Sequence, residues 1–311
     1  MSAARGLLLA APKSGSGKTV LTLGLLRHWT RSGIVAVPFK AGPDYIDAAY
    51  HSAAAGQACI NLDSWAMRGR SLDASAAALA QGAEFVLGEG VMGLFDGAAG
   101  GGGATADLAA HFSLPVVLVI DVRGQGASVA ALAQGFASHR ADVEVAAVIF
   151  NHVASARHEE ILNSALAPTG IAVLGALPRD AALALPTRHL GLVQAGESED
   201  LEAFLNAAAN HVARYVNGEG LRALGRPLRA PHGATPPCLL EPLGQKIAVA
   251  RDMAFAFSYE AVLAGWRQAG AGLSFFSPLA DEAPEAGADA IYLPGGYPEL
   301  YAGRLAANRN L

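Results

Sequence analysis

The sequence has little cysteine, with Cys59 and Cys238 as the only two in 311 residues. They form neither a CxxC pair nor a Cys/His cluster of metal-ligand spacing, which argues against a disulfide framework and against a cysteine-ligated metal. Neither lies in a glycine-flanked turn that would expose a reactive thiolate, so small buried apolar side chains are expected at both positions. A reducing, cytoplasmic location is predicted.

Charge and long apolar runs are also scarce. Charged residues make up 16% of the chain, the net charge is -5, and no basic tract occurs. Nucleic acid is therefore not expected as the main partner, because phosphate-backbone binding needs clustered Lys and Arg. No apolar run approaches the roughly 20 residues that span a bilayer, and the apolar part of the N-terminus is too short for a signal peptide. A compact soluble protein with no membrane partner is predicted.

Lysine is much rarer than arginine. The four lysines are Lys13, Lys18, Lys40 and Lys246, and three of them lie in the first 40 residues, at the ends of the first two predicted strands. A lysine supplies a compact point charge where arginine supplies a planar fork. We therefore expect Lys40 to contact an anion, whereas Lys246 has no evident chemical role.

The first 180 residues alternate short apolar strands with Ala-rich helical stretches. The strands are nearly continuous in Val, Ile, Leu and Ala, as expected when helices cover both faces of a parallel sheet. The fold class predicted for residues 1–216 is a doubly wound, mostly parallel α/β sheet with ligands at the carboxyl ends of its strands. The predicted strands are Gly6–Ala11, Ile34–Phe39, Glu84–Gly88, Pro115–Asp121, Val143–Phe150 and Ile171–Leu177.

The periodic pattern lapses over residues 217–244, which are rich in Gly, Pro and Arg and are predicted to form a linker. Residues 245–311 restart as a second α/β unit with too few strands to close an independent sheet. Its predicted elements are the strands Lys246–Ala250, Leu273–Phe276 and Ala290–Leu293 and the helix Tyr259–Ala269.

A strand, a glycine-containing turn and a helix follow one another in residues 7–21, LLLAAPKSGSGKTVL. Backbone N–H groups and the helix dipole at such a helix start favour an anion, the lysine of GKT reaches terminal phosphates, and its threonine binds Mg²⁺. The template GxxxxGK[ST] places its first Gly where Pro12 stands, and Lys13 is an additional lysine. The predicted nucleotide-binding set is Lys13, Ser14, Gly15, Ser16, Gly17, Lys18 and Thr19.

Carboxylates follow the predicted strands. Asp44 and Asp47, in PFKAGPDYIDAAYH, either share one ligand such as Mg²⁺ or cap a turn or helix. Glu89 ends an otherwise apolar strand, where a carboxylate is costly unless it is paired or bound to a metal. Asp96 follows in a glycine loop, and residues 100–103, all glycine, predict a mobile flap over the site.

Three later residues are also candidates. Asn151 ends a strand and either reads a nucleobase edge or caps the next helix. In LPTRHLGLV, Arg188 can clamp a carboxylate bidentately. His189 has either a catalytic or a structural hydrogen-bonding role.

With these residues assembled, the chain resembles the cobyrinic acid or hydrogenobyrinic acid a,c-diamide synthases of vitamin B12 biosynthesis. The resemblance covers essentially the whole chain and rests on APKSGSGKT, FKAGPDYIDAAYH, EGVMGLFDG, LPTRHLGLV and LPGGYPELYA, in that order. It implies an ATP-binding domain similar to dethiobiotin synthetase, joined to a class I glutamine amidotransferase domain. It also implies that ATP phosphorylates peripheral carboxylates of a corrinoid, and that ammonia from glutamine converts the acyl phosphates of the a and c acetates to amides.

The resemblance implies roles for matching residues. Lys18, Thr19 and Glu89 fall in the ATP and Mg²⁺ set, with Thr19, Asp47 and Glu89 as the metal candidates. Asp44, Asp47 and Asp96 organise metal, substrate or intermediate, and Lys40 joins them in catalysis. The residues assigned to substrate binding are Tyr45, Ile46, Arg188 and His189.

Gly295 and Gly296 match the oxyanion region of the amidotransferase. In the family pattern a glycine-flanked nucleophilic Cys follows this segment, and these 311 residues contain none, since neither Cys59 nor Cys238 occupies its place. The resemblance thus predicts a truncated chain, or one whose remaining half is elsewhere, that could use free ammonia at most. Relatives of the fold also suggest a homodimer.

Two alternative functions stay open. One is another ATP-dependent carboxylate ligase of this fold, such as dethiobiotin synthetase or cobyric acid synthase. The other is a nucleotide-switch ATPase, because Lys13 lies five residues before Lys18, the spacing of a lysine that such ATPases insert across a dimer. Lys13 is accordingly a phosphate ligand, a dimer contact or a solvated side chain.

Overall fold

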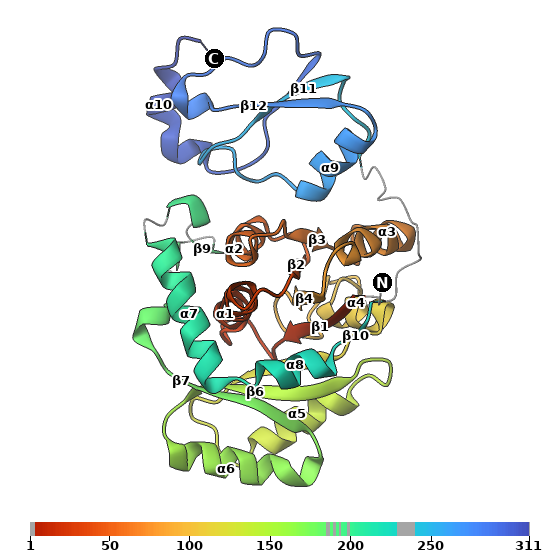
Figure 1. The fold of residues 1–311 in the computed structure, drawn as a ribbon, viewed down its shortest axis with the longest axis vertical. Coiled ribbons are helices and arrows are strands. Elements are labelled where there is room, and N and C mark those ends of the chain that lie inside the picture. The colour runs from red at the N-terminus through yellow and green to blue at the C-terminus, as the bar shows by residue number, and fades with distance from the viewer. Residues whose placement is uncertain are drawn as a thin grey trace.

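The first lobe is built on one sheet whose central strand, β1 (Arg5–Ala10), runs into the predicted phosphate loop. The computed structural model describes residues 4–184, 187–188, 191–192, 194–197, 200–228 and 240–310. Figure 1 shows the larger lobe, coloured red to green, and a smaller second lobe in blue on the side where α2 and β3 lie.

Seven strands of this sheet are parallel, in the order β3-β2-β4-β1-β5-β6-β7, and β10 (Arg226–Pro227) pairs antiparallel with β1. The order confirms the doubly wound, mostly parallel fold. From β1 the chain fills one side of the sheet with β2, β3 and β4, and then fills the other side with β5, β6 and β7. The other strands are β2 (Ala36–Ala41), β3 (Ile60–Leu62), β4 (Phe85–Glu89), β5 (Val116–Asp121), β6 (Val145–Val153) and β7 (Ala172–Pro178).

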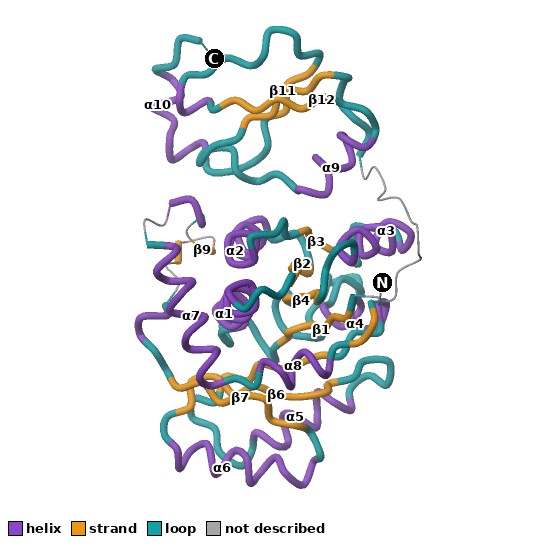
Figure 2. The backbone as a smooth tube through the Cα atoms, in the orientation of Figure 1, coloured by secondary structure: helices purple, strands orange, loops and turns teal. Residues whose placement is uncertain are grey.

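Helices cover both faces of the sheet, as Figure 2 shows. Along β1, Leu8 packs into one core cluster, whereas Leu7 and Leu9 pack into the other, so the strand is apolar on both faces from Leu7 to Ala10. One face carries α1 (Lys18–Arg31), α2 (Tyr45–Ala55), α7 (Leu201–Tyr215) and α8 (Gly218–Leu224). The other carries α3 (Gly69–Ala80), α4 (Thr105–Phe112), α5 (Val129–Ser138) and α6 (Ala156–Leu166).

The structure differs from the sequence prediction in two places. Strand β3 was not predicted, because a strand of three residues is too short to show a period. Helix α8 and strand β10 lie inside residues 217–244, so the expectation of a linker without regular structure is wrong for this part. Pairing of β10 with the first two residues of β1 and the burial of Leu221 hold this segment on the first lobe. This is a tertiary effect that local composition does not reveal.

The second lobe is a small parallel unit of β11 (Lys246–Ala250), β12 (Gly272–Phe276) and β13 (Ala290–Tyr292), in the order β12-β11-β13. The helix α9 (Glu260–Gln268) packs Leu263 and Trp266 against Ile247 and Val249. These elements match the predicted bounds to within a few residues. Among the described residues, the remaining α-helix is α10 (Ala302–Ala306), and the remaining strands are the antiparallel pair β8 (Thr187–Arg188) and β9 (Gly191–Leu192).

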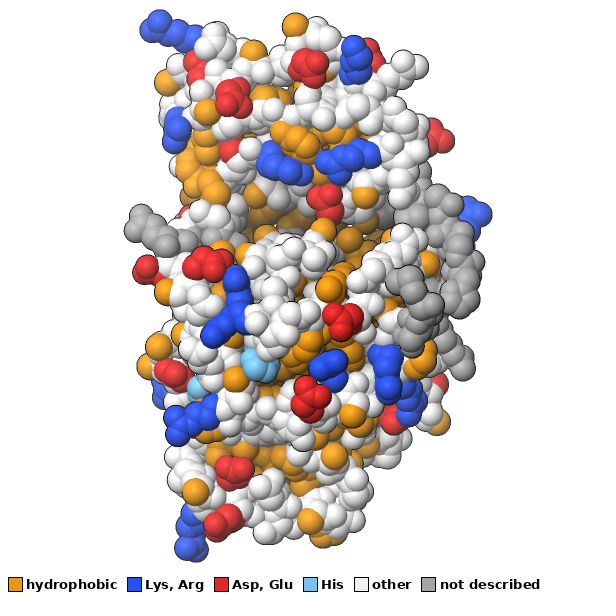
Figure 3. Space-filling model, in the orientation of Figure 1, with side chains coloured by type: hydrophobic (Ala, Val, Ile, Leu, Met, Phe, Trp, Pro, Cys, Tyr) orange, Lys and Arg blue, Asp and Glu red, His pale blue; other side chains and the backbone are white. Residues whose placement is uncertain are grey.

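The two lobes meet through aromatic side chains. Tyr45 of α2 stacks on Phe257 and on Tyr259, with ring centroids 5.1 Å and 4.2 Å apart. The Tyr259 hydroxyl also donates a hydrogen bond to the carbonyl of Pro43 at 3.3 Å. Figure 3 shows a hollowed band between the lobes, with hydrophobic side chains in its depth. Among the residues described above, no helix is long and apolar enough to cross a membrane.

Candidate active site

The phosphate loop joins β1 to α1, whose first residue is Lys18. Gly17 precedes the helix with a φ of 88°, and a Cβ at this position would lie 2.0 Å from Asn151 Nδ2. Both the backbone conformation and the close approach therefore require glycine here. The Ser16 hydroxyl donates to the carbonyl of Lys13 at 2.9 Å, which closes the loop on itself.

Lys18 is buried at the mouth of this loop. Its Nζ donates to the carbonyl oxygen of Met92 at 2.7 Å, and burial lowers the pKa of the ammonium. Met92 has a φ of 50°, an uncommon conformation for a residue with a side chain. A single backbone oxygen is a weaker partner for an ammonium than a phosphate oxygen, so a phosphate could replace it.

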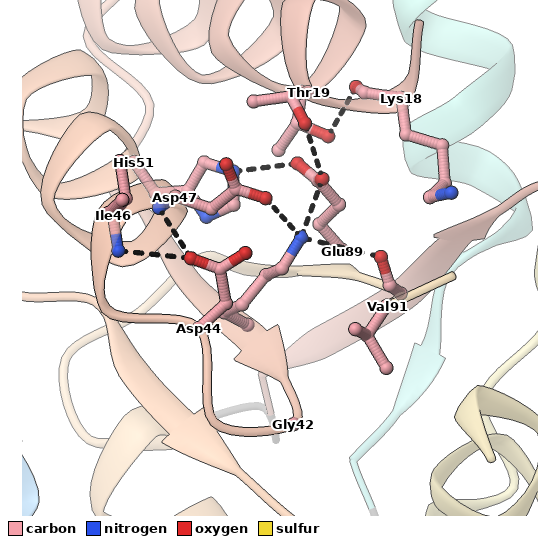
Figure 4. Close-up of polar contacts among 12 residues, drawn as sticks. Lys18, Thr19, Gly42, Asp44, Ile46, Asp47, His51, Glu89 and Val91 are labelled. Atoms are coloured by element: carbon pink, nitrogen blue, oxygen red, sulfur yellow. Dashed lines mark hydrogen bonds and ion pairs between the residues drawn. The ribbon is translucent and has the colours of Figure 1, made fainter. Parts of the chain in front are cut away.

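Lys40 and Glu89 face each other because parallel β2 and β4 place them directly side by side. Lys40 Nζ donates to Glu89 Oε1 at 2.8 Å and to Asp47 Oδ2 at 2.5 Å. Lys40 is 2% exposed and Glu89 1% exposed, so this charge cluster is shielded from water. Figure 4 shows the side chains of Thr19, Asp47 and Glu89 pointing toward one another from three elements.

The protonation states follow from burial and from these contacts. Burial alone would lower the pKa of Lys40, but Glu89 and Asp47 outweigh it and hold the pKa above its usual value. Burial would likewise raise the pKa of Glu89, yet Lys40 and His51 hold it well below the usual range. Burial and the neighbouring Glu89 raise the pKa of Asp47. Lys40 and Glu89 therefore form an ionised pair, whereas the carboxyl group of Asp47 is more easily protonated.

The oxygen donors in this cluster suit a hard cation. The Thr19 hydroxyl donates to Glu89 Oε1 at 2.8 Å, which places the two predicted Mg²⁺ contacts together beside the phosphate loop. Within the described part of the chain, no group of three or more His, Cys, Asp or Glu side chains could by itself hold a metal ion. Mg²⁺ at nucleotide sites commonly takes one or two carboxylates and completes its shell with phosphates and water, and Asp47 and Glu89, with the Thr19 hydroxyl beside them, fit that pattern.

Two of the predicted carboxylates have local partners. Asp44 is the N-cap of α2, where its Oδ1 accepts hydrogen bonds from the N–H groups of Ile46 and Asp47 at 3.0 Å. Asp96 Oδ2 accepts from the N–H of Gly93 at 2.9 Å within its own loop. The capping alternative is therefore what the structure shows for Asp44. Among the described contacts, neither Asp44 nor Asp96 is hydrogen-bonded to a side chain of the Lys40 cluster, which consists of Lys40, Asp47 and Glu89.

His51 is a member of the cluster that the sequence interpretation did not single out. It is fully buried, and its Nε2 lies 2.7 Å from Glu89 Oε2, while its Nδ1 lies 3.7 Å from the Cys59 sulfur. His51 lies four residues after Asp47 on α2, so both side chains share one helix face. That spacing from a predicted site residue is the signal that could have identified it.

Comparison with known proteins places the chain in a family. The family model of the CobQ/CobB/MinD/ParA nucleotide binding domain matches residues 7–193. The chain belongs to this family. The phosphate loop and the Lys40 cluster both lie inside the matched residues, so the charges described above belong to its nucleotide-binding domain.

Relatives within the family are similar over almost the whole chain. Hydrogenobyrinate a,c-diamide synthase of Brucella anthropi is 56% identical over 304 residues, which are 97% of this chain and 70% of the relative. The proteins of the same name from Brucella ovis and Rhodobacter capsulatus are 57% and 53% identical over the same shares. Among solved structures, chloroplast FtsY from Physcomitrella patens is 15% identical over 67% of this chain and 66% of that chain, with a TM-score of 0.44.

Asn151 of the family's nucleotide-binding domain supports the phosphate loop. Its Nδ2 donates to the carbonyl of Ser16 at 3.0 Å, and its Oδ1 accepts from the N–H of His152. Next to it, burial disfavours the charged form of Asp121, but hydrogen bonds from Arg123 and His152 hold the pKa of Asp121 at about 2. Nucleobase reading by Asn151 stays a prediction, because both ends of its amide have protein partners in this structure.

Other predicted residues lie at the margins of the site. Lys13 is exposed, and its ammonium has no hydrogen-bond or ion-pair partner within the described residues. The Tyr45 ring stacks on Phe257 and Tyr259 of the second lobe, and Ile46 is half-buried at the start of α2. Ser14 and Gly15 are exposed in the loop. Arg188 lies in β8, its side chain is not described, and His189 lies outside the described residues.

The predicted oxyanion segment is held close to the first lobe. The N–H of Phe257 donates to the carbonyl of Gly295 at 2.8 Å, and Phe257 in turn stacks on Tyr45. A Cβ at Gly296 would lie 2.0 Å from the carbonyl oxygen of Ala254, so the segment packs against the loop after β11. Gly295 is therefore connected to α2 through Phe257, which donates a hydrogen bond to the Gly295 carbonyl and stacks on Tyr45 of α2.

Replacement of His51 by Phe is expected to weaken Mg²⁺-dependent ATP binding about 10- to 100-fold, since outer groups that orient a metal-site carboxylate have effects of this size. His51→Gln retains a side-chain hydrogen-bond donor near the position of Nε2. Its Mg²⁺-dependent affinity for ATP should therefore be closer to that of the unchanged chain. Isothermal titration calorimetry with ATP, with and without Mg²⁺, measures both variants. His111→Phe is the matched control, because it removes a similar contact to Asp73, 2.7 Å long, away from the site. Equal affinities of the His51→Phe and His111→Phe variants would contradict the prediction.

Proposed function

We propose that this chain catalyses the ATP-dependent amidation of the a and c acetate carboxylates of hydrogenobyrinic or cobyrinic acid. One observation carries the proposal: two buried lysines, a phosphate loop and an ionised glutamate converge at the carboxyl ends of β1, β2 and β4. The names of the relatives supply the substrate, since all those described above are hydrogenobyrinate a,c-diamide synthases.

In the first step, a carboxylate oxygen of the substrate attacks the γ-phosphorus of ATP, and the bond from this phosphorus to the β-phosphate oxygen breaks. The products are an acyl phosphate and ADP. Such a transfer needs positioning and charge neutralisation more than it needs a protein nucleophile. Lys18 and the N–H groups at the start of α1 hold the phosphates, and Lys40 lies where it can neutralise charge between the two reactants.

In the second step, ammonia attacks the acyl carbon, inorganic phosphate leaves and the nitrogen loses a proton, which gives the amide. Asp47 is the carboxyl group of the cluster whose pKa is raised, by burial and by Glu89, so it takes up that proton more readily than Glu89 once it is not bound to Mg²⁺. One round at each acetate produces the diamide. The site contains no residue that must be consumed between the rounds.

Mg²⁺ would be held by Thr19 and Glu89, with Asp47 as a further oxygen ligand, and it would neutralise charge on the transferring phosphate. For these oxygens to face the cation, Lys40 has to release part of its contact with Glu89 or Asp47. The ammonium can then turn toward the phosphate or the substrate carboxylate. Before the nucleotide binds, Lys40 therefore neutralises part of the negative charge of Asp47 and Glu89.

Glutamine is the proposed nitrogen source, and the second lobe is the proposed start of a class I amidotransferase domain with Gly295 and Gly296 in its oxyanion region. The contact from Phe257 to the Gly295 carbonyl and the stack on Tyr45 support this placement, because they join that segment to the synthase lobe. We also propose that the protein forms a homodimer and that it acts in the cytoplasm.

The test uses the purified chain with Mg·ATP, ammonium chloride and hydrogenobyrinic acid. The proposal expects one ADP for each amide formed and an end product with two amides, identified by mass spectrometry. If ATP were hydrolysed at the same rate with and without the acid, and no amide formed, the synthase function would be wrong. A nucleotide-switch ATPase would then be the better description, and a Lys13→Ala variant that loses its ATPase activity would favour it.

A further inference from the structure

Trp65 is the exposed tryptophan of this chain. Its side chain is 69% exposed, whereas Trp29 and Trp266 are each 2% exposed and belong to the cores of the two lobes. Exposing an indole ring to water forgoes a large hydrophobic contribution to folding. Tryptophan is enriched at binding interfaces because its ring is apolar and its N–H is polar, so an exposed tryptophan that is held in a defined place is a candidate ligand contact.

The turn that carries Trp65 is well braced. Asp63 Oδ1 accepts hydrogen bonds from the N–H groups of Trp65 at 2.8 Å and Ala66 at 3.2 Å. On the other side, the glycine loop approaches so closely that a Cβ at Gly103 would lie 2.9 Å from the Cβ of Trp65, and Gly103 has a φ of 78°. The ring is thus presented outward by a fixed backbone.

Two arginines follow Trp65 within five residues. Arg68 and Arg70 are both exposed, and neither guanidinium has a hydrogen-bond or ion-pair partner within the described residues. An unpaired guanidinium is suited to bidentate binding of a carboxylate. The exposed residues Trp65, Arg68 and Arg70, here called the tryptophan–arginine surface, therefore place an apolar ring and two unpaired positive charges within six residues of the chain.

This surface lies within reach of the reactive cluster. In the sheet, Asn61 of β3 pairs directly with Lys40 of β2, and neighbouring strands are about 5 Å apart. Trp65 is four residues beyond Asn61, which an extended chain spans in at most about 14 Å. Asn61 also donates to the carbonyls of Gly42 and Asp44 at 2.8 and 2.9 Å, so β3 is fastened to the loop that leads into α2.

The second lobe approaches from the same direction, because α9 lies against β3. The tryptophan–arginine surface leads from β3 into α3 (Gly69–Ala80), which lies on the side of the first lobe that faces the second lobe (Figure 1). A substrate whose one carboxylate reaches Lys40 would extend from the cluster toward this side if it were large. A small substrate would not reach it.

We propose that the tryptophan–arginine surface is a subsite for the non-reacting part of a large polycarboxylate substrate. Trp65 packs against an apolar face or edge of the macrocycle, and Arg68 and Arg70 bind peripheral carboxylates that are not being amidated. The inference rests on the proposed function for the identity of the substrate. It adds a specificity site that acts on binding and leaves the phosphoryl transfer step unchanged.

The test compares Trp65→Ala, Trp65→Phe and the double variant Arg68→Gln/Arg70→Gln in ammonia-dependent amidation of hydrogenobyrinic acid. Trp65→Ala and the double variant should each raise KM for the acid about tenfold, since aromatic packing and charged hydrogen bonds have effects of this order. The kcat and the KM for ATP should stay within about twofold of the unchanged chain, because the phosphate loop is untouched. Trp65→Phe should recover most of the loss.

Arg157→Gln is the matched control, because Arg157 is also exposed and unpaired among the described residues but lies on α6, at the far end of the molecule (Figure 1). An unchanged KM for the acid in both surface variants would overturn the inference, as would an equal rise in the Arg157→Gln control. Calorimetric titration of each variant with hydrogenobyrinic acid, without ATP, provides a second readout. If the unchanged chain formed no amide but bound the acid more tightly than the surface variants, the proposed function would fail and the subsite would stand.

Discussion

In the Glu89→Gln variant, amide formation from hydrogenobyrinate, ATP and ammonia is expected to fall at least about 100-fold, the size of effect seen when one preorganised charge contact is lost at a phosphoryl or acyl transfer site. Glu89 Oε1 accepts from Thr19 and Lys40, each at 2.8 Å, and glutamine keeps the shape but not the charge. Without that charge, the magnesium contact is lost and Lys40 loses one of its two carboxylate partners. Initial rates at saturating Mg·ATP measure the effect.

The same substitution also affects stability, because it leaves a buried ammonium with one carboxylate fewer. The free energy of unfolding is expected to fall by about 3 kcal/mol. Glu84→Gln is the matched control, since Glu84 is exposed next to the opposite end of the same strand and accepts the N–H of Val35. Activity is compared at a temperature where both variants are folded by circular dichroism. If the Glu89→Gln variant kept its activity at that temperature, Glu89 would not belong to the active site.

Replacement of Lys40 by Met is expected to lower the free energy of unfolding by about 3–5 kcal/mol, because two carboxylates are left in a buried place without their cation. The penalty should depend on pH in a definite direction. Burial and the neighbouring Glu89 already raise the pKa of Asp47, and loss of Lys40 raises it further. A raised pKa in the folded state adds stability at acid pH, so the penalty should be smaller near about pH 5 than near about pH 8.

Urea unfolding at the two pH values measures this difference. Lys246→Met is the matched control, because Lys246 is exposed at the start of β11 and should change stability by less than about 0.5 kcal/mol. An equal penalty for Lys40→Met at both pH values would contradict the picture of two carboxylates repelling each other. A penalty as small as that of the control would contradict the burial of the Lys40 cluster itself.

The elements that could be predicted from the sequence are those with a strong local pattern. The strand around Leu87 was predicted over Glu84–Gly88 and is observed over Phe85–Glu89. The short β3 and β10 were missed, since two or three residues show no period and their pairing depends on neighbours far away in the chain. Helix α8 was missed for a similar reason, because it has only seven residues and its segment looked like a linker.

The candidate site was predicted in part. Lys18, Thr19, Lys40, Asp47 and Glu89 were predicted and are brought together. His51 was not singled out, although it lies four residues after Asp47 on α2, because its carboxylate partner Glu89 is 38 residues away in the chain and meets it only in the folded protein. Trp65 was not noticed either, because its exposure is a property of the folded surface.

The sequence by itself determined the parallel fold, the phosphate loop and the placement of charges at strand ends, because each depends on residues close together in the chain. Only the tertiary structure decided which charges are partners. Lys40 and Glu89 are 49 residues apart and meet through the register of β2 and β4, and one face of α2 adds Asp47 and His51. Asp44 and Asp96 carry the same chemistry but are bound to N–H groups of their own turns, a choice made by backbone geometry that the residue type does not specify.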